Sequence, residues 1–342
     1  MNTLYEDRHV IIGILGTSFI SWNLLFPKIR EAFKEFTKPK SEWVPVGRIK
    51  SLHIYPIKSC KGKEVFQYRC TALGPVFGEY YDRHFLVING EDGKFHTART
   101  KPQMVLVETV IENGIVTLSF PEKESIQFKI EDVLANKDLR NGFLHCKLRT
   151  DGFDCGDEAA AFFSDVLEEP GTRLIMYDSE LFTERTCKTE EGWWNNPVPK
   201  RVDNTAYADL APYMITTEAS LNDLNSKLDH DVTSIHFRPC IVVDDCPAWD
   251  EDKWLDLRIG DVKLQCFKPC TRCILTTVDP ENGVKDKDMQ PLKKLREFRL
   301  GPGKLREEFG ESPIFGVNAG VVQTGYIHVG QTVWAKYKPS AF

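Results

Sequence analysis

The sequence predicts a mainly β protein of the α+β class, built from mixed β-barrels with peripheral helices behind an N-terminal membrane-anchor helix. Three observations support this prediction. Short apolar or alternating segments bounded by turn residues recur from residue 46 onwards, which is typical of strands. These segments do not alternate with helices in the regular rhythm of a doubly wound parallel sheet. Residues 10–27 form an uncharged run close to the N-terminus.

The overall composition indicates a globular protein of ordinary kind. The 342 residues suffice for roughly two domains, and 42% of them are apolar and 27% charged. The net charge of −6, with no long basic stripe, argues against nucleic-acid binding. The ten cysteines are not spaced like a small secreted disulfide framework, so we expect most of them to be free thiols in a reducing compartment.

The N-terminal run, VIIGILGTSFISWNLLFP, is at the short end of what spans a bilayer. A cleaved signal peptide would need a basic leading segment and a small-residue cleavage site, whereas Glu6 and Asp7 precede the run. Five lysines and arginines against two glutamates follow it between residues 28 and 40, which places the C-terminal bulk in the cytosol. We therefore expect an uncleaved transmembrane anchor at 1–27 and a tether at 28–45, in preference to a signal peptide or a buried helix.

The next segment, residues 46–183, reads as a first β-barrel domain. Strands are expected at 47–55 and 85–90, and residues 105–120 read as a hairpin with Asn113-Gly114 at its tip. A helix is expected over 157–169, because it carries apolar residues on one face and is followed by Pro170.

The last part, residues 184–338, reads as a second β domain. Residues 184–204 are polar and aperiodic, so they are expected to be a linker or lid. Helices are expected at 217–229, capped by Thr217, and at 291–299, which has a proline in its first turn. The expected strands are 240–245, 257–267, 273–279 and several within 320–337.

The chemistry-bearing segment is KPCTRCILTTVDP, residues 268–280, in which Cys270 and Cys273 stand three apart. A zinc or iron–sulfur site would need further paired cysteines; Cys266 and either Cys240 or Cys246 are candidates, but no second C-x-x-C exists. A redox dithiol normally opens a helix, whereas ILTTV reads as a strand. The neighbouring positive charge of Arg272 favours a thiolate at Cys273. A soft thiolate of this kind suits a high-valent transition metal.

Cationic and hydroxyl residues recur at predicted strand ends. Lys58 and Ser59 lie in YPIKSCKG, Arg83 lies in DRHF and Arg238 in HFRPC. Together with Arg272 they could clamp an anionic, phosphate-bearing ligand, although each alone is more often a solvated surface charge. The sequence contains no Walker loop, no G-x-G-x-x-G turn, no G-x-S-x-G elbow and no H-E-x-x-H pair, which gives nucleotide-binding and hydrolase readings little support.

Eight motifs in one order resemble a known family. They are YPIKSCKG (55–62), DRHFLVING (82–90), TARTKP (97–102), DCG (154–156), FRPCIVV (237–243), IGDVKL (259–264), KPCTRCILTTVDPENG (268–283) and ESPIFG (311–316). Over about residues 46–338 the chain resembles the mitochondrial amidoxime reducing components, molybdenum enzymes built on the MOSC domain. The resemblance implies an N-terminal MOSC-type β-barrel domain at 46–183 and a MOSC domain at 184–338.

The resemblance also implies a molybdenum cofactor, a pterin dithiolene that carries a phosphate. It assigns the metal ligand to Cys273 and not to Cys270, and this cysteine is the expected catalytic residue. The other cofactor-binding residues that it implies are Lys58, Ser59, Arg83, Asp209, Leu210, Ala211, Arg238, Thr271, Arg272 and Asn318. The chain departs from the family pattern at Leu210 and Ala211, at Asn318, and at GWWNNP (192–197), which puts substrate preference in doubt.

The activity implied by the resemblance is the reduction of N-hydroxylated compounds, namely amidoximes, hydroxylamines and N-oxides. Electrons would come from cytochrome b5 and its NADH-dependent reductase, on the outer mitochondrial membrane with the catalytic part facing the cytosol. The alternatives are a molybdenum-cofactor carrier, a sulfur-handling MOSC protein without reductase activity, and a structural zinc module. No general acid stands out among the candidates His53, His84, His96 and His236.

Overall fold

The computed structural model describes residues 42–144, 148–196 and 198–342, of which 43–342 form one compact unit. The expected anchor at 1–27 lies outside the described residues, as does most of the tether at 28–45. Within the described part of the chain, no helix is both long and apolar enough to cross a bilayer.

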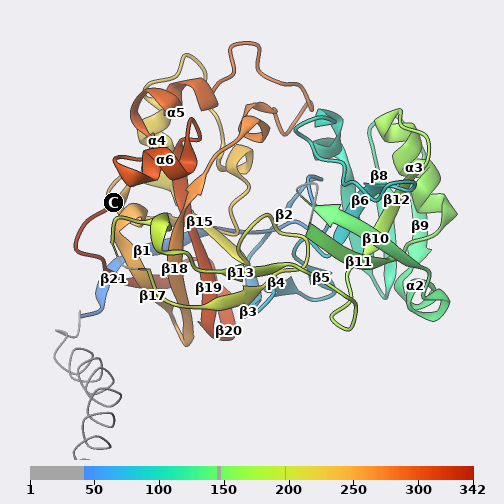
Figure 1. The fold of residues 1–342 in the computed structure, drawn as a ribbon, viewed down its shortest axis with the longest axis horizontal. Coiled ribbons are helices and arrows are strands. Elements are labelled where there is room, and N and C mark those ends of the chain that lie inside the picture. The colour runs from blue at the N-terminus through green and yellow to red at the C-terminus, as the bar shows by residue number, and fades with distance from the viewer. Residues whose placement is uncertain (1–41, 145–147, 197) are drawn as a thin grey trace, which may run out of the picture. The chain divides into compact units, whose positions relative to one another are not determined.

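A closed barrel of seven strands forms one side of the fold, at the left in Figure 1. Going around it, the strands are β16 (Ile241–Asp244), β15 (Tyr213–Thr217), β19 (Ile314–Gln323), β18 (Val262–Thr271), β17 (Trp254–Ile259), β21 (Thr332–Tyr337) and β1 (Val44–Ile54). Pairing of β1 with β16 closes the barrel, and β2 (Lys63–Val65) adds to the outside of β1. Only β15 and β16 run parallel, so the barrel is mixed. The predicted mainly β fold is confirmed.

Strands from the N-terminal and C-terminal halves of the sequence pair with each other in two places. Strand β1 comes from the N-terminal end, yet it pairs with β16 and β21 of the C-terminal half. In the other direction, β20 (Gly325–His328) pairs with β3 (Gln67–Thr71), which continues into β4 (Gly74–Phe77) and β5 (Tyr80–Tyr81). The domain boundary expected at 183/184 stays a prediction.

The remaining N-terminal strands form two further sheets. One has the order β10 (Leu139–Leu144), β11 (Leu148–Asp154), β12 (Thr172–Met176) and β6 (Phe85–Asn89), and α3 (Asp157–Leu167) packs against β12. The predicted helix therefore forms, and it ends where Glu168 turns left-handed with φ 51°.

The other sheet contains β7 (Glu108–Glu112), β8 (Ile115–Ser119) and β9 (Ile126–Lys129), followed by α2 (Ile130–Asn136). Asn113 and Gly114 have φ values of 53° and 72°, the pair of left-handed residues that a two-residue hairpin turn requires. The predicted hairpin is therefore confirmed.

Helices α4 (Glu218–Asn225), α5 (Leu292–Phe298) and α6 (Lys304–Phe309) lie near one another beside the barrel (Figure 1). The predicted cap of α4 is present, because the hydroxyl of Thr217 accepts a hydrogen bond from the amide of Ser220 at 3.2 Å.

Two local predictions were wrong. Residues 273–279 do not form a strand; they contain the 3₁₀ turn Ile274–Thr277. The hydroxyls of Thr276 and Thr277 donate to the carbonyls of Cys273 and Ile274 at 3.0 and 2.8 Å, a local alternative to a strand ladder. The described residues of 184–204 also do not form an irregular linker, since β13 (Thr186–Lys188) pairs there with β14 (Val202–Asn204); the alternative of a lid stays a prediction.

Candidate cofactor site

All eleven residues that the resemblance assigns to the site line a single cavity of about 270 Å³. They come from loops far apart in the sequence: the turn after β1, the turn before β6, residues 208–211 before β15, the turn before β16, the end of β18, and the middle of β19. The barrel therefore brings the predicted residues together. The role of each in holding a cofactor stays a prediction.

Cys273 sits at the end of the loop that follows β18, directly before the 3₁₀ turn. Among the nine cysteines that the structure describes, it alone is exposed. Cys240 and Cys266 are buried, as expected for small core residues, and Cys270 is half-buried. No three His, Cys, Asp or Glu side chains group as a metal-ligand set among the residues described. A structural zinc site therefore has no geometric support in this part of the chain.

The thiol that Arg272 contacts is not the one expected from sequence. Its Nη1 lies 3.0 Å from Sγ of Cys270, and its Nη2 donates to the carbonyl of Phe237 at 2.7 Å. Its Nε is buried and has no partner among the described residues. The carbonyl of Phe237 holds the guanidinium beside Cys270, and the predicted support of a Cys273 thiolate by Arg272 stays a prediction.

Two guanidinium groups enclose the ring of Tyr55. Arg83 and Arg238 each lie 4.3 Å from the ring centroid, and Tyr55 is fully buried. Arg83 is also paired with buried Asp82 at 2.6 Å, while Nη2 of Arg238 donates to the carbonyl of Cys60 at 2.7 Å. Burial, followed by the proximity of Arg83, lowers the pKa of Arg238 to about 10. Two like charges held this close favour an anionic ligand between the loops.

Three residues of the site have left-handed backbones that non-glycine residues rarely adopt. The φ values are 71° at Ser59, 47° at Arg83 and 53° at Arg238. Each such residue costs on the order of 1–3 kcal/mol, and such outliers cluster where the surrounding structure holds a functional geometry. The unfavourable backbone conformation of these three residues thus accompanies their position at the cavity.

Lys58 is a buried cation with a fixed position. Its Nζ donates to Oδ1 of Asp209 at 2.6 Å and to the carbonyl of Tyr207 at 2.8 Å. Burial lowers the pKa of Lys58 to about 8, although the negative charge of Asp209 acts to raise it. Arg185, which was not predicted as a site residue, donates to the carbonyls of Ala208 and Asp209. These hydrogen bonds fix the loop 208–211 that carries Asp209. The place of Arg185 in an aperiodic segment gave no signal of that role.

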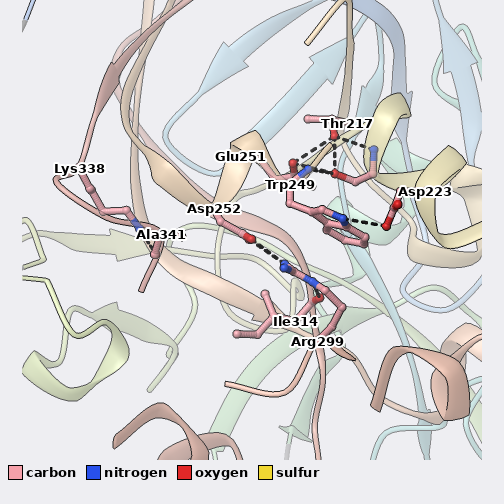
Figure 2. Close-up of polar contacts among 10 residues, drawn as sticks. Thr217, Asp223, Trp249, Glu251, Asp252, Arg299, Ile314, Lys338 and Ala341 are labelled. Atoms are coloured by element: carbon pink, nitrogen blue, oxygen red, sulfur yellow. Dashed lines mark hydrogen bonds and ion pairs between the residues drawn. The ribbon is translucent and has the colours of Figure 1, made fainter. Parts of the chain in front are cut away.

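The Cys273 loop is supported by a buried ion pair, shown in Figure 2. Nη2 of Arg299 contacts both carboxylate oxygens of Asp252, at 2.9 and 2.7 Å. Nε of Arg299 donates to the carbonyl of Ile314 at 3.1 Å, and the amide of Ile314 donates back to the carbonyl of Arg299 at 2.8 Å. Ile314 pairs with Thr271 of β18, so the ion pair fixes the strand end that leads into Cys273.

Further cavity residues were not assigned from sequence. Arg99 and Lys268 raise the number of lysines and arginines in the lining to six, against the single carboxylate of Asp209. Arg99 and its neighbour Thr97 lie in the TARTKP motif, which was a usable signal. The other unassigned lining residues are Ala208, Met214, Phe237, Cys240, Cys270 and Leu275. No histidine is among the lining residues that the structure describes, so none of the four candidates lies at this cavity.

The two tryptophans of the GWWNNP segment are part of the core near the site. Trp193 and Trp194 are buried, with 3% and 4% of their surfaces exposed. Nζ of Lys268 lies 4.4 Å from the ring centroid of Trp193, and burial lowers the pKa of this lysine. Trp193 therefore contacts Lys268, a lysine that lines the cavity.

Comparison with known proteins defines the class of protein. Residues 46–170 match the family model of the MOSC N-terminal beta barrel domain, and residues 203–334 match that of the MOSC domain. The chain is thus a two-part MOSC protein. It belongs to the family of mitochondrial amidoxime-reducing components, as the resemblance predicted.

Three relatives show the extent of the similarity. Mitochondrial amidoxime-reducing component 1 of Mus musculus is 35% identical over 94% of this chain and 88% of its own length. Component 1 of Danio rerio is 37% identical over 96% of this chain and 95% of its own. Component 2 of Homo sapiens is 36% identical over 94% of this chain and 89% of its own.

Proposed function

We propose that this chain is a molybdenum-cofactor-dependent reductase of N-hydroxylated compounds: amidoximes, hydroxylamines and N-oxides. The observation that carries the proposal is the exposed thiol of Cys273 in a cavity lined by six cations and one carboxylate. The names of the relatives, amidoxime-reducing components, support amidoximes among these substrates.

The residues present fit such a cofactor. A thiolate is a soft ligand for a high-valent metal, and Cys273 is accessible to one. A pterin with a phosphate group is anionic, and the guanidinium groups of Arg83 and Arg238 suit a phosphate. The buried Nε of Arg272, which lacks a protein partner among the described residues, is a further donor for a ligand.

The bound cofactor would supply the two-electron reduction of the N–O bond. Cys273 would hold the metal, and Lys58, Arg83 and Arg238 would neutralise and orient the anionic part of the cofactor. Reduction to the amine or amidine consumes two electrons and two protons and releases water. Because Cys273 is exposed, those protons can arrive from solvent, which fits a cavity without histidine among its described lining.

We further propose that the electrons come from cytochrome b5 and its NADH-dependent reductase on the outer mitochondrial membrane, with the catalytic part facing the cytosol. Residues 10–27 are uncharged, and the relatives are named mitochondrial components. Confining donor and acceptor to one membrane surface raises their effective concentration.

The test is metal and pterin analysis of the purified full-length chain beside Cys273→Ser, with Cys246→Ser as a matched control that does not line the cavity. We expect near-stoichiometric molybdenum and pterin in the wild type and the control, with molybdenum lost in Cys273→Ser. Zinc in place of molybdenum, or molybdenum unaffected by Cys273→Ser, would overturn the assignment. Bound cofactor without turnover of benzamidoxime by a chemical reductant would favour a cofactor carrier instead.

A further inference from the structure

A second cavity, of about 450 Å³, lies next to the candidate cofactor site and shares no lining residue with it. The two meet along one short stretch of chain. Arg83 lines the first cavity, whereas its neighbours Asp82 and His84 line the second. The volume is within the usual range for sites that bind small organic molecules.

Aromatic side chains form one wall of this second cavity. The ring of His84 lies 5.0 Å from that of Tyr81 and 5.8 Å from that of Tyr177, measured between ring centroids. Burial lowers the pKa of His84 to about 4, so its ring is neutral at physiological pH. His84 therefore adds no positive charge to this wall, and the faces of neutral aromatic rings attract cations.

Polar atoms of this wall have no protein partner. Only 6% of the surface of Tyr177 is exposed, and its hydroxyl forms no hydrogen bond with any residue that the structure describes. The ring nitrogens of His84 likewise have no hydrogen-bond partner within the described ranges. Both groups line the cavity, so they can bond to a ligand or to water there.

The charge of the second cavity is opposite to that of the first. Its described lining contains no lysine or arginine, and its unpaired carboxylates are Glu79 and Asp178, since Asp82 is paired with Arg83. One oxygen of Glu79 accepts from the amide of Gly114 at 2.9 Å, and one oxygen of Asp178 accepts from the amide of Glu180 at 2.8 Å. Both carboxylates are thus held in place by one oxygen each.

Aliphatic side chains complete the lining. They are Leu73, Val76, Ile130, Leu134 and Met176. A ligand that fills this cavity therefore has an apolar body, because burial of apolar surface there is favourable. A charged head would lie against the aromatic wall and the carboxylates.

We propose that the second cavity is a binding site for a small organic cation with an apolar body, such as an arylamidinium or arylalkylammonium ion. A cation gains from the faces of the aromatic rings and from the two fixed carboxylates, and its N–H groups can donate to the unpartnered atoms of His84 and Tyr177. An anion is repelled by the same carboxylates. The site is independent of the reaction proposed above, because the two cavities have separate linings.

The test is calorimetric titration of the full-length protein with three ligands of nearly equal shape: benzamidinium, benzamide and benzoate. We expect benzamidinium to bind about tenfold more tightly than benzamide, and benzoate not to bind. The double variant Glu79→Gln/Asp178→Asn keeps an acceptor oxygen at each position, so the loop contacts stay, and it should lose that preference. The control Glu112→Gln/Glu158→Gln removes two carboxylates that line neither cavity and should behave as wild type.

A second variant separates binding at this site from binding elsewhere. Tyr177→Phe removes only the unpartnered hydroxyl and should weaken benzamidinium binding severalfold, with unchanged thermal unfolding. Equal binding of benzamide and benzamidinium would replace the proposal by a neutral apolar site. Binding of benzamidinium that neither variant alters, or no binding at millimolar concentration, would overturn it.

Discussion

Replacing Arg299 by methionine tests how the fold supports the Cys273 loop. The side chains have similar volumes, so packing changes little while the charge is lost. The substitution removes two hydrogen bonds to Asp252 and one to the carbonyl of Ile314. It also removes a cation that lies 4.0 Å from the ring centroid of Trp249.

The expected cost follows from the burial of the partner. Only 2% of the surface of Asp252 is exposed, so Arg299→Met leaves a buried carboxylate without its ion-pair partner. Removing one partner of a buried pair costs about 3–5 kcal/mol. Replacing both partners, as in Asp252→Leu/Arg299→Met, should restore much of that loss, because an apolar pair carries no desolvation penalty.

Urea unfolding of the full-length chain, followed by tryptophan fluorescence, measures these differences as changes in midpoint at constant slope. The matched control is Arg306→Met, which breaks an exposed pair with Glu311 and should cost less than about 1 kcal/mol. If Arg299→Met costs no more than this control, or if the double variant is less stable than the single one, the ion pair does not support the loop in the way described.

Three further predictions concern protonation, backbone conformation and the cofactor. Burial and a neighbouring carboxylate raise the pKa of Glu251 from 4.5 to about 7, so the folded protein keeps a proton that the unfolded chain releases. As the pH rises from about 5 to about 7, the unfolding free energy of the wild type should therefore decrease relative to that of Glu251→Gln. Parallel pH curves of the two proteins in urea unfolding would contradict this. Gly114→Ala should cost about 1 kcal/mol, because φ there is 72°, while Gly192→Ala, also in open space but without a positive φ, should be near neutral in the same assay. Arg238→Met should lower the pterin content of the purified protein about tenfold, and Arg258→Met, outside the cavity, should leave it unchanged; equal pterin contents would remove Arg238 from the site.

The sequence predicted features that depend on local signals. The Asn113-Gly114 turn, the Thr217 cap and the helix before Pro170 follow from backbone preferences that act over a few residues. The eleven lining residues could be named because whole motifs resemble a family; as isolated cations and hydroxyls they would have been read as surface residues.

What the sequence did not predict depends on contacts between distant segments. Arg272 turns to Cys270 because of the carbonyl of Phe237, 35 residues away. Arg185 acts on carbonyls more than 20 residues further along, from a segment with no periodicity. The turn after Cys273 looked like a strand because its threonines favour strands in general, while their hydroxyls here bond to nearby carbonyls instead.

The position of β1 has a consequence for how the molecule is made. Its partners β16 and β21 lie roughly 200 and 290 residues further along the chain. The barrel strand that is synthesised first therefore pairs with the one that is synthesised last. Contacts of such long sequence separation form slowly, and until β16 and β21 have been synthesised the edges of β1 that they cover can join another chain. A fragment that begins at residue 184 would leave the matching edges of β16 and β21 open. The closed barrel that carries the cavity beside Cys273 therefore needs strands that are about 290 residues apart in the sequence.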